Sequence, residues 1–453
     1  MHTKFIRIFF LLLTGFLLFP SPALAVPSFA RQTGMDCAAC HIAFPELTPF
    51  GREFKLNGYT LGERQWVPLA AMMQFSMTNI AKNHDNTGAK LMPHENDPQF
   101  DVLSIFAAGK LNDHVGMFVQ WTYSNNEDQG NDGSIRGHSS LDNTDIRFVL
   151  NHDIFDKNLV LGVTLNNNPT VQDVWNTSPA WSFPYTGPNL PHPGPAFATV
   201  IDGGLGQQVA GLGAYFWYDR HLYGELSLYG SANGFWRPLS AGQAWNKQDG
   251  VTRINGRDNP YWRLAWNEDW GPHSLMVGTY GMLVDIYPDN LNPSGPTDRF
   301  TDTALDAQYQ YLSDPHIFTV QTSYIHEKQH YKASFDPTCD PTAEACQNAH
   351  DHINTFKVKG SYLYDRKYGA SLAYFNTTGS NDAVAFDNEG SNPVTKPDNQ
   401  GYIAQFDYNP WTFTHITLQY TGYTKWDGSR QVDNLGLKPR DRNTLYLGTW
   451  FAF

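Results

Sequence analysis

Five consecutive residues near the N-terminus carry the clearest chemistry in this sequence: Cys37-Ala38-Ala39-Cys40-His41. Two thiols separated by two residues and followed directly by an imidazole form the attachment motif of a c-type haem. The thiols of Cys37 and Cys40 would add to the porphyrin vinyl groups and become thioethers, and His41 would bind the iron as proximal ligand. The sequence therefore predicts one covalently attached haem c.

A Cys-x-x-Cys pair also occurs in thioredoxin-like redox proteins and in zinc sites, so two other interpretations exist. A redox pair is expected in a βαβ context, and a zinc site needs a second pair of cysteines or histidines nearby. Neither accompanies Cys37 and Cys40. The motif therefore favours haem.

No motif fixes the distal ligand of the iron. Met72 is the preferred candidate, because alternation along its predicted strand directs it, with Gln74, toward the interior. An inward methionine otherwise serves packing alone. His84 and His94 follow in the next predicted loop and are the runners-up. Met35 precedes the haem motif by too few residues to reach the other face of the porphyrin.

The other two cysteines, Cys339 and Cys346, lie in a polar stretch that contains proline. In an exported chain such a pair is expected to form a disulfide. The alternative is a metal site that also uses His330, His350 and His352.

Residues 1–25 have the pattern of a secretory signal peptide. Lys4 and Arg7 precede an apolar run over residues 8–19, and small residues lead to a predicted cleavage site after Ala25. The alternative, a transmembrane anchor, requires a longer apolar run.

Residues 26–65 form the predicted haem segment. Thr48-Pro49 is typical of a helix N-cap and first helical position, and Asn57-Gly58 of a helix end. About forty residues are too few to bury a core around a haem, so this segment must pack against the rest of the chain. Arg52 and Lys55 either pair with the haem propionates or are solvated charges on the short helix.

From residue 66 to 453 apolar residues recur at every second position, as in Leu159–Asn166. Sixteen such segments alternate between short and long connections, and the last ends in a terminal Phe453. This pattern is typical of a bacterial outer-membrane barrel. We predict an all-β fold, a 16-stranded antiparallel transmembrane β-barrel over residues 66–453. A soluble β-sandwich is the alternative, but it does not require alternating connection lengths.

Composition agrees with a membrane barrel, because aromatic residues make up 14% of the chain and charged residues 17%, against about 25% in ordinary soluble domains. The net charge is −13. This balance argues against nucleic acid as a partner and favours the approach of cations. With outer-membrane lipid around the barrel, we expect the long loops to be extracellular, the N-terminus periplasmic or luminal, and the haem segment inside the lumen.

The signal peptide, the haem motif shortly after it, the stretch Phe44–Leu56 (FPELTPFGREFKL) and the sixteen-stranded barrel together resemble the fused monohaem cytochrome–porins. These are outer-membrane electron-transfer proteins, best known as iron oxidases of iron-oxidising bacteria. The resemblance covers the whole architecture and assigns residue roles only to Cys37, Cys40 and His41.

This resemblance implies electron transfer, with Fe(II) oxidase activity, from extracellular Fe(II) to a periplasmic cytochrome or another soluble carrier. One-electron transfer needs no acid–base residues, and none are evident in the sequence. Two alternatives remain. One is a diffusion porin whose haem is structural or sensory, and the other is a conduit that exports electrons to an extracellular acceptor.

Overall fold

The computed structural model describes residues 27–129, 135–188, 196–241, 251–340, 342, 345–387 and 394–453. The predicted signal peptide, residues 1–25, lies outside these ranges. Within them, no helix has the length and apolar character needed to cross a membrane.

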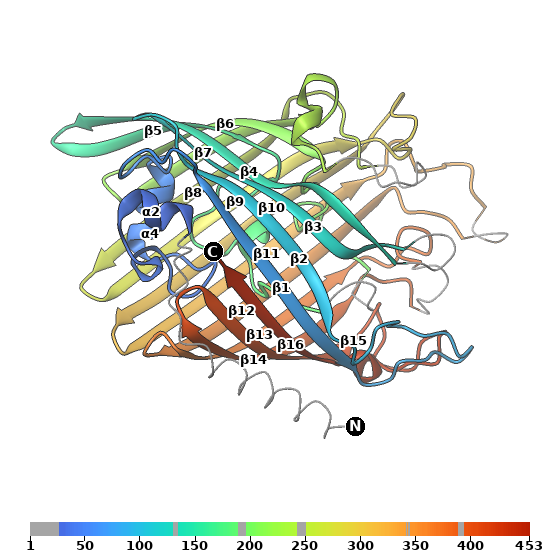
Figure 1. Cartoon of the computed structure of the whole chain (residues 1–453). Coiled ribbons are helices and arrows are strands. Elements are labelled where there is room, and N and C mark those ends of the chain that lie inside the picture. The colour runs from blue at the N-terminus through green and yellow to red at the C-terminus, as the bar shows by residue number, and fades with distance from the viewer. Residues whose placement is uncertain are drawn as a thin grey trace.

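The described residues form sixteen strands, each paired antiparallel with its sequence neighbours, and β1 pairs with β16 to close the sheet into a barrel (Figure 1). The strands are β1 (Leu69–Ile80), β2 (Gln99–Lys110), β3 (Val115–Gln129), β4 (Ile135–Ile154), β5 (Lys157–Asn166), β6 (Val209–Tyr218), β7 (Leu222–Ser231), β8 (Asn259–Trp270), β9 (His273–Ile286), β10 (Asp298–Ser313), β11 (His316–His330), β12 (His350–Tyr364), β13 (Tyr368–Gly379), β14 (Asn399–Trp411), β15 (Thr414–Lys425) and β16 (Thr444–Ala452).

The two faces of the barrel wall differ in polarity. On β10 the inward side chains of Asp302 and Asp306 are buried, whereas Leu305 between them is 64% exposed on the outside. Outward Leu372 and Phe406 are exposed to a similar degree, 70% and 63%. A closed barrel with an apolar exterior and a polar interior satisfies all backbone hydrogen bonds within a bilayer. The predicted fold class is therefore confirmed, and the protein is an outer-membrane β-barrel.

Short turns gather at one end of the barrel, called here the short-turn end. Three of these turns have positive φ at both central residues, which are Phe155-Asp156, Asp219-Arg220 and Asp365-Arg366. Two such residues define a type I′ turn, whose twist matches that of the strands it joins. The long connections lie at the opposite end, called the loop end.

Several strands reach further toward the loop end than the sequence predicts. The alternation pattern predicts a long connection over residues 125–141, but β3 continues to Gln129 and β4 begins at Ile135. Likewise β11 and β12 extend to His330 and from His350. Beyond the bilayer both faces of a strand meet water, so the apolar alternation disappears before the hydrogen-bonded ladder ends.

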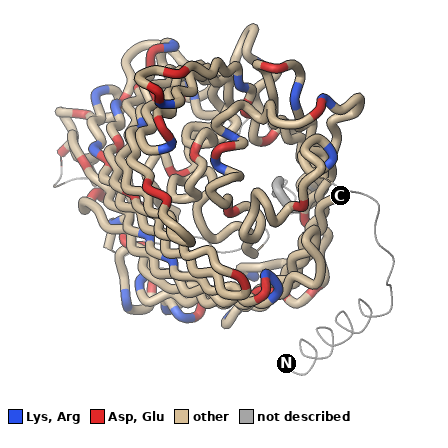
Figure 2. The backbone as a smooth tube through the Cα atoms, turned by 90° about the vertical axis from the view of Figure 1, so that its left-hand side faces the viewer, with Lys and Arg blue, Asp and Glu red and all other residues tan. Residues whose placement is uncertain are grey.

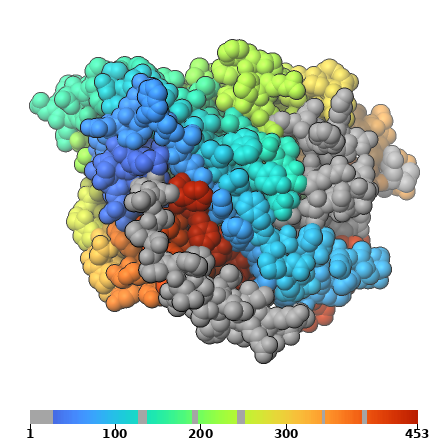
Figure 3. All heavy atoms as spheres, in the orientation of Figure 1, coloured from blue at the N-terminus to red at the C-terminus, as the bar shows by residue number. Residues whose placement is uncertain are grey.

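Three helices precede the barrel: α2 (Ser28–Thr33), α3 (Cys37–Cys40) and α4 (Pro49–Leu56). The predicted caps of the last helix are confirmed, with Thr48 as N-cap and Asn57 as C-cap. In the end-on view the helical coil lies within the ring of strands (Figure 2). The space-filling view shows this N-terminal segment, in dark blue, at the short-turn end beside the red C-terminal strand (Figure 3).

A second segment also enters the lumen. Residues 167–188, called here the inward loop, follow β5 and fold back inside the barrel, where Val171, Val174 and Trp175 are fully buried. The 3₁₀-helices of the described chain are η1 (Pro179–Trp181), which belongs to this loop, η2 (Gly234–Leu239) and η4 (Pro439–Arg442). The N-terminal helices and the inward loop thus both lie in the interior, and Ile201 and Leu205 also pack against the inner wall.

Candidate functional site

A cavity of about 480 Å³ lies between the N-terminal helices, the inward loop and strands at the seam of the barrel. Its lining includes Cys37, Cys40, His41 and Met72. The volume lies within the roughly 300–1,000 Å³ of sites that hold organic ligands. The structure therefore brings to one cavity the haem-motif residues and the preferred distal candidate.

The two thiols of the motif share one side of α3. Cys37 and Cys40 are three residues apart in this short helix, which places their side chains on the same face. Neither is in a disulfide. Burial raises the pKa of the Cys40 thiol to about 11 and also raises the pKa of Cys37. Redox-active pairs have lowered thiol pKa values, so these cysteines do not fit the thioredoxin-like interpretation.

His41 follows α3 as its C-cap and also lines the cavity. Burial lowers the pKa of its imidazole to about 4, so the ring is neutral at pH 7. Neutral imidazole is the form that binds a metal. Among the described residues the buried Nδ1 atom has no hydrogen-bond partner, and an orphaned buried polar atom calls for an explanation such as a bound group.

The segment after the motif holds α3 against α4. The backbone nitrogen of Thr48 donates to the Cys40 carbonyl at 2.9 Å, and its hydroxyl donates to the Ala39 carbonyl at 2.6 Å. Gly51 then packs directly on Cys40, since a Cβ at that position would lie 2.2 Å from the Cys40 carbonyl oxygen. A residue with a side chain cannot occupy this place without moving α3. Sequence reasoning missed Gly51, because only the packed structure shows what its missing side chain avoids.

Aromatic rings surround the cavity. Phe29 of α2 contacts Phe54 of α4 edge to face at 5.0 Å and stacks on Tyr59 at 5.3 Å between ring centroids. On the other side Phe44 lies 4.6 Å from the His41 ring and 6.1 Å from Trp450 of β16. These apolar walls suit the flat, apolar body of a porphyrin and limit its contact with water.

Arg52 has neither of the two roles considered from the sequence, which were pairing with the haem propionates and a solvated surface charge. It is buried, lies outside the cavity lining, and donates to Gln310 at 2.7 Å and to Ser274 at 2.5 Å on the barrel wall. Burial lowers the pKa of its guanidinium to about 10, against the opposing charges of Asp269 and Asp173. Arg52 therefore anchors α4 to the wall.

Lys55 is buried at the edge of the cavity, so it is not a solvated charge. Its Nζ donates to the carbonyls of Val171 at 2.7 Å and Asp173 at 3.0 Å and lies over the Trp181 ring. Burial lowers the pKa of this amine to about 7. Lys55 thus ties the haem segment to the inward loop, and a role toward propionates stays a prediction.

Two further contacts, also missed from the sequence, clamp the motif to the wall. Arg366, in the turn between β12 and β13, donates to the carbonyls of Ala38 and His41 at 3.2 and 3.4 Å. Glu46 pairs with Lys359 of β12 and accepts from the Tyr185 hydroxyl at 2.7 Å. Arg366 and Lys359 lie hundreds of positions from the motif, and no local pattern distinguishes them from other turn or strand residues.

The runner-up distal ligands do not reach the cavity. His84 and His94 lie in the connection after β1, whose Asn86 contacts Leu435 at the loop end of the barrel. The strand β1 separates this loop from Met72 by roughly 25 Å at about 3.3 Å per residue. The prediction for these histidines is therefore wrong, because the loop leaves the barrel at the opposite end.

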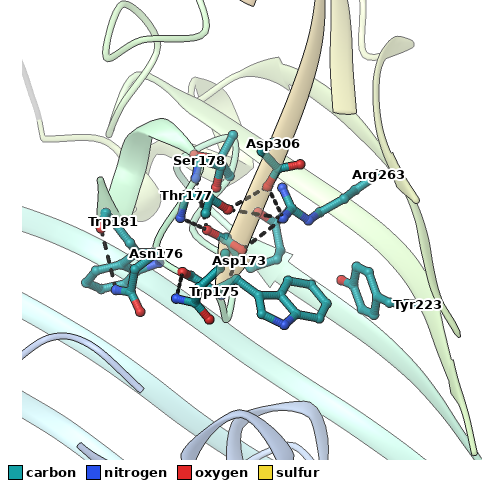
Figure 4. Close-up of polar contacts among 12 residues, drawn as sticks. Asp173, Trp175, Asn176, Thr177, Ser178, Trp181, Tyr223, Arg263 and Asp306 are labelled. Atoms are coloured by element: carbon teal, nitrogen blue, oxygen red, sulfur yellow. Dashed lines mark hydrogen bonds and ion pairs between the residues drawn. The ribbon is translucent and has the colours of Figure 1, made fainter. Parts of the chain in front are cut away.

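A buried charge cluster fixes the inward loop to the wall (Figure 4). Arg263 of β8 lies between two carboxylates, 2.6 Å from Asp306 of β10 and 3.3 Å from Asp173 of the loop. Asp173 also accepts from the backbone of Thr177 and Ser178 at 3.0 and 3.1 Å. A buried guanidinium between two carboxylates holds the loop in one position. The sequence gives no signal for this cluster beyond the unusual length of the connection after β5.

The second cysteine pair forms a disulfide between Cys339 and Cys346 in the connection between β11 and β12. Its sulfurs are therefore not available as metal ligands. The metal site that would combine these cysteines with His330, His350 and His352 is not formed.

The fold and the cavity together define the class of protein. It is a porin-like outer-membrane barrel with a cavity of ligand size at its short-turn end. No known family matches the sequence, and no curated protein does. Among solved structures, the chain is similar to the outer membrane channel DcaP of Acinetobacter baumannii, with 12% identity, a TM-score of 0.47, and 85% of this chain and 96% of that chain covered. It is also similar to an anion-selective porin from Comamonas acidovorans, with 11% identity, a TM-score of 0.45, and 85% and 98% covered.

Proposed function

We propose that this barrel is a monohaem c-type cytochrome of the outer membrane, which moves electrons between an extracellular donor, foremost Fe(II), and a soluble periplasmic carrier. The observation that carries the proposal is the cavity that collects Cys37, Cys40, His41 and Met72. A bound haem c would supply reversible one-electron exchange. The size of the cavity, its aromatic walls and the orphaned His41 nitrogen all fit that group.

Each lining residue has a definite task under this proposal. The S–H groups of Cys37 and Cys40 would add across the two vinyl double bonds, so that no atom is lost and two thioethers form. His41 would supply the proximal nitrogen in its neutral form. Met72, which is only 5% exposed, would supply a thioether sulfur as a second ligand to the iron.

The placement of the site supports exchange with a periplasmic partner. Short turns of outer-membrane barrels face the periplasm. The cavity lies at that end, so a soluble carrier would approach close to the cofactor. The net charge of −13 would favour the approach of a dissolved cation.

The first test is spectroscopic. Protein matured with its signal peptide in a host that attaches haem c should give the absorption of a haem with two thioether bonds. Oxidised protein is then mixed with Fe(II) in a stopped-flow instrument. Rapid appearance of the reduced spectrum supports the proposal, and a protein that binds haem but is not reduced by Fe(II) excludes iron as the donor.

The second candidate is a diffusion pore with a structural or sensory haem, and the porin-like barrel favours it. Against it, the haem segment and the inward loop occupy the lumen and bond to one another through Lys55 and Glu46. Planar-bilayer recordings distinguish the two. A steady open-pore current would favour the pore, and near-silent membranes would favour the electron conduit. The midpoint potential then tests direction, because uptake from iron needs a potential above that of the donor.

A further inference from the structure

The outer face of the β11–β12 hairpin carries a ladder of histidines near the loop end. His330 and His350 are directly opposite one another in the antiparallel register, at the last rung before the disulfide-containing connection. Below them, His352 lies two residues from His350 and His326 lies four residues from His330, and the ring centroids of His326 and His352 are 6.2 Å apart. Alternation places all four imidazoles on the outside of the barrel, away from the cavity and the lumen.

The upper pair differs from the lower one in its contacts. The lower rings are engaged, since His326 shares a hydrogen bond with Asn354 at 2.7 Å and His352 with Ser380 at 2.9 Å. The rings of His330 and His350 lie only 4.1 Å apart between centroids. Within the described part of the chain these two rings contact each other and have no hydrogen-bond partner.

We propose that His330 and His350 form a surface site for a divalent transition-metal ion such as Ni²⁺ or Zn²⁺. Imidazole suits these ions, and a metal–nitrogen bond is about 2.0–2.1 Å. Two rings with centroids 4.1 Å apart can direct one nitrogen each to a single ion after a small side-chain rotation. The described residues contain no group of three metal-binding side chains, so water completes the coordination.

The surroundings of the pair support this assignment. The opposed strand positions fix both backbones, so little freedom is lost on binding. The nearest cation on β10, Arg299, is already paired with Asp285 through two hydrogen bonds of 2.8 Å. Lys328 lies two residues from His330 on the same face of β11, and its positive charge weakens the binding of a cation. We therefore expect an exchangeable metal ion at this site and not a structural one.

The test is calorimetric titration of the full-length mature protein in detergent with Ni²⁺ alone, at pH 7.5. His330→Asn and His350→Asn should each weaken one binding event about tenfold or more, and the double variant should abolish it. The matched control is His152→Asn, an exposed strand histidine whose cross-strand partner is Leu159. This control should bind Ni²⁺ as the parent protein does.

Folding of each variant is checked by its heat-dependent mobility in gel electrophoresis, which distinguishes closed barrels from unfolded chains. Equal Ni²⁺ binding by the parent and the double variant would overturn the proposal. So would an equal loss in the His152 control. Because the pair lies outside the barrel, the outcome is independent of whether the lumen carries a haem.

Discussion

The N-terminal segment and the inward loop pack against the same barrel wall in different ways. The N-terminal segment, residues 27–65, packs its helices around a cavity of about 480 Å³. The inward loop, residues 167–188, fills its own space with side chains such as Trp175, which is 1% exposed and donates to Asn267. Both are held by charges to the wall, Arg52 in the first and Asp173 in the second.

This difference distinguishes the N-terminal segment, which borders a cavity, from the inward loop, which serves mainly as structural support. A folded chain normally fills its interior to the density of an organic crystal. The part of the loop around Trp175 meets that expectation by packing against the barrel wall, whereas the N-terminal segment borders the cavity beside Cys37, Cys40 and His41. The loop is therefore the support against which the N-terminal segment rests.

The largest expected effect is the loss of covalent haem, which depends on the N-terminal segment. Cys37→Ala with Cys40→Ala should abolish covalent haem, measured as haem that stays with the chain after acidified-acetone extraction. The control, Cys339→Ser with Cys346→Ser, removes the disulfide at the loop end and should retain full haem content. Retention of covalent haem by the first double variant would refute the assignment of the site.

Disruption of the charge cluster that holds the inward loop is expected to lower the stability of the protein instead. Arg263→Met leaves Asp173 and Asp306 buried without their shared cation, which should lower the free energy of unfolding by about 3–5 kcal/mol. Guanidinium unfolding in lipid vesicles, followed by tryptophan fluorescence, measures this loss. Asp219→Asn removes a turn ion pair with exposed Lys157 and serves as control, with no measurable loss expected. Equal stability of the two variants would contradict the role of the cluster.

A smaller change should loosen only the haem segment. Gly51→Ala forces a Cβ against the Cys40 carbonyl, and overpacking of this kind costs about 1–3 kcal/mol. The yield of covalent haem should fall, because α3 no longer lies in place for attachment. Gly360→Ala on β12 has open space around the added carbon and should leave the yield unchanged. Parent-like haem yield in Gly51→Ala would show that the α3–α4 contact does not position the motif.

The mildest change addresses the distal ligand. Met72→Leu conserves volume, so the loss of stability should stay below about 1.5 kcal/mol. If Met72 binds the iron, the midpoint potential should fall, since a methionine ligand raises it, and the absorption of the sulfur–iron bond should vanish. Met35→Leu, at the same cavity, is the matched control. A change in the Met35 variant alone would transfer the role to that residue.

Local sequence patterns determined much of this protein. Apolar alternation predicted the sixteen strands and Thr48-Pro49 the start of α4, because each is a short-range consequence of backbone geometry. The spacing of Cys37, Cys40 and His41 pointed to residues that the structure gathers at one cavity, and their role toward haem stays a prediction. Strand ends at the loop end were misjudged where alternation stops in water.

Only the closed barrel decided the rest. It brought Met72 of β1, Arg366 of the β12–β13 turn and Lys359 of β12 to the N-terminal segment, across hundreds of residues. It also sent His84 and His94 to the opposite end and folded the inward loop against Arg263. Closure of a sheet depends on the register of all its strands together, so no single stretch of sequence records which distant side chains will meet.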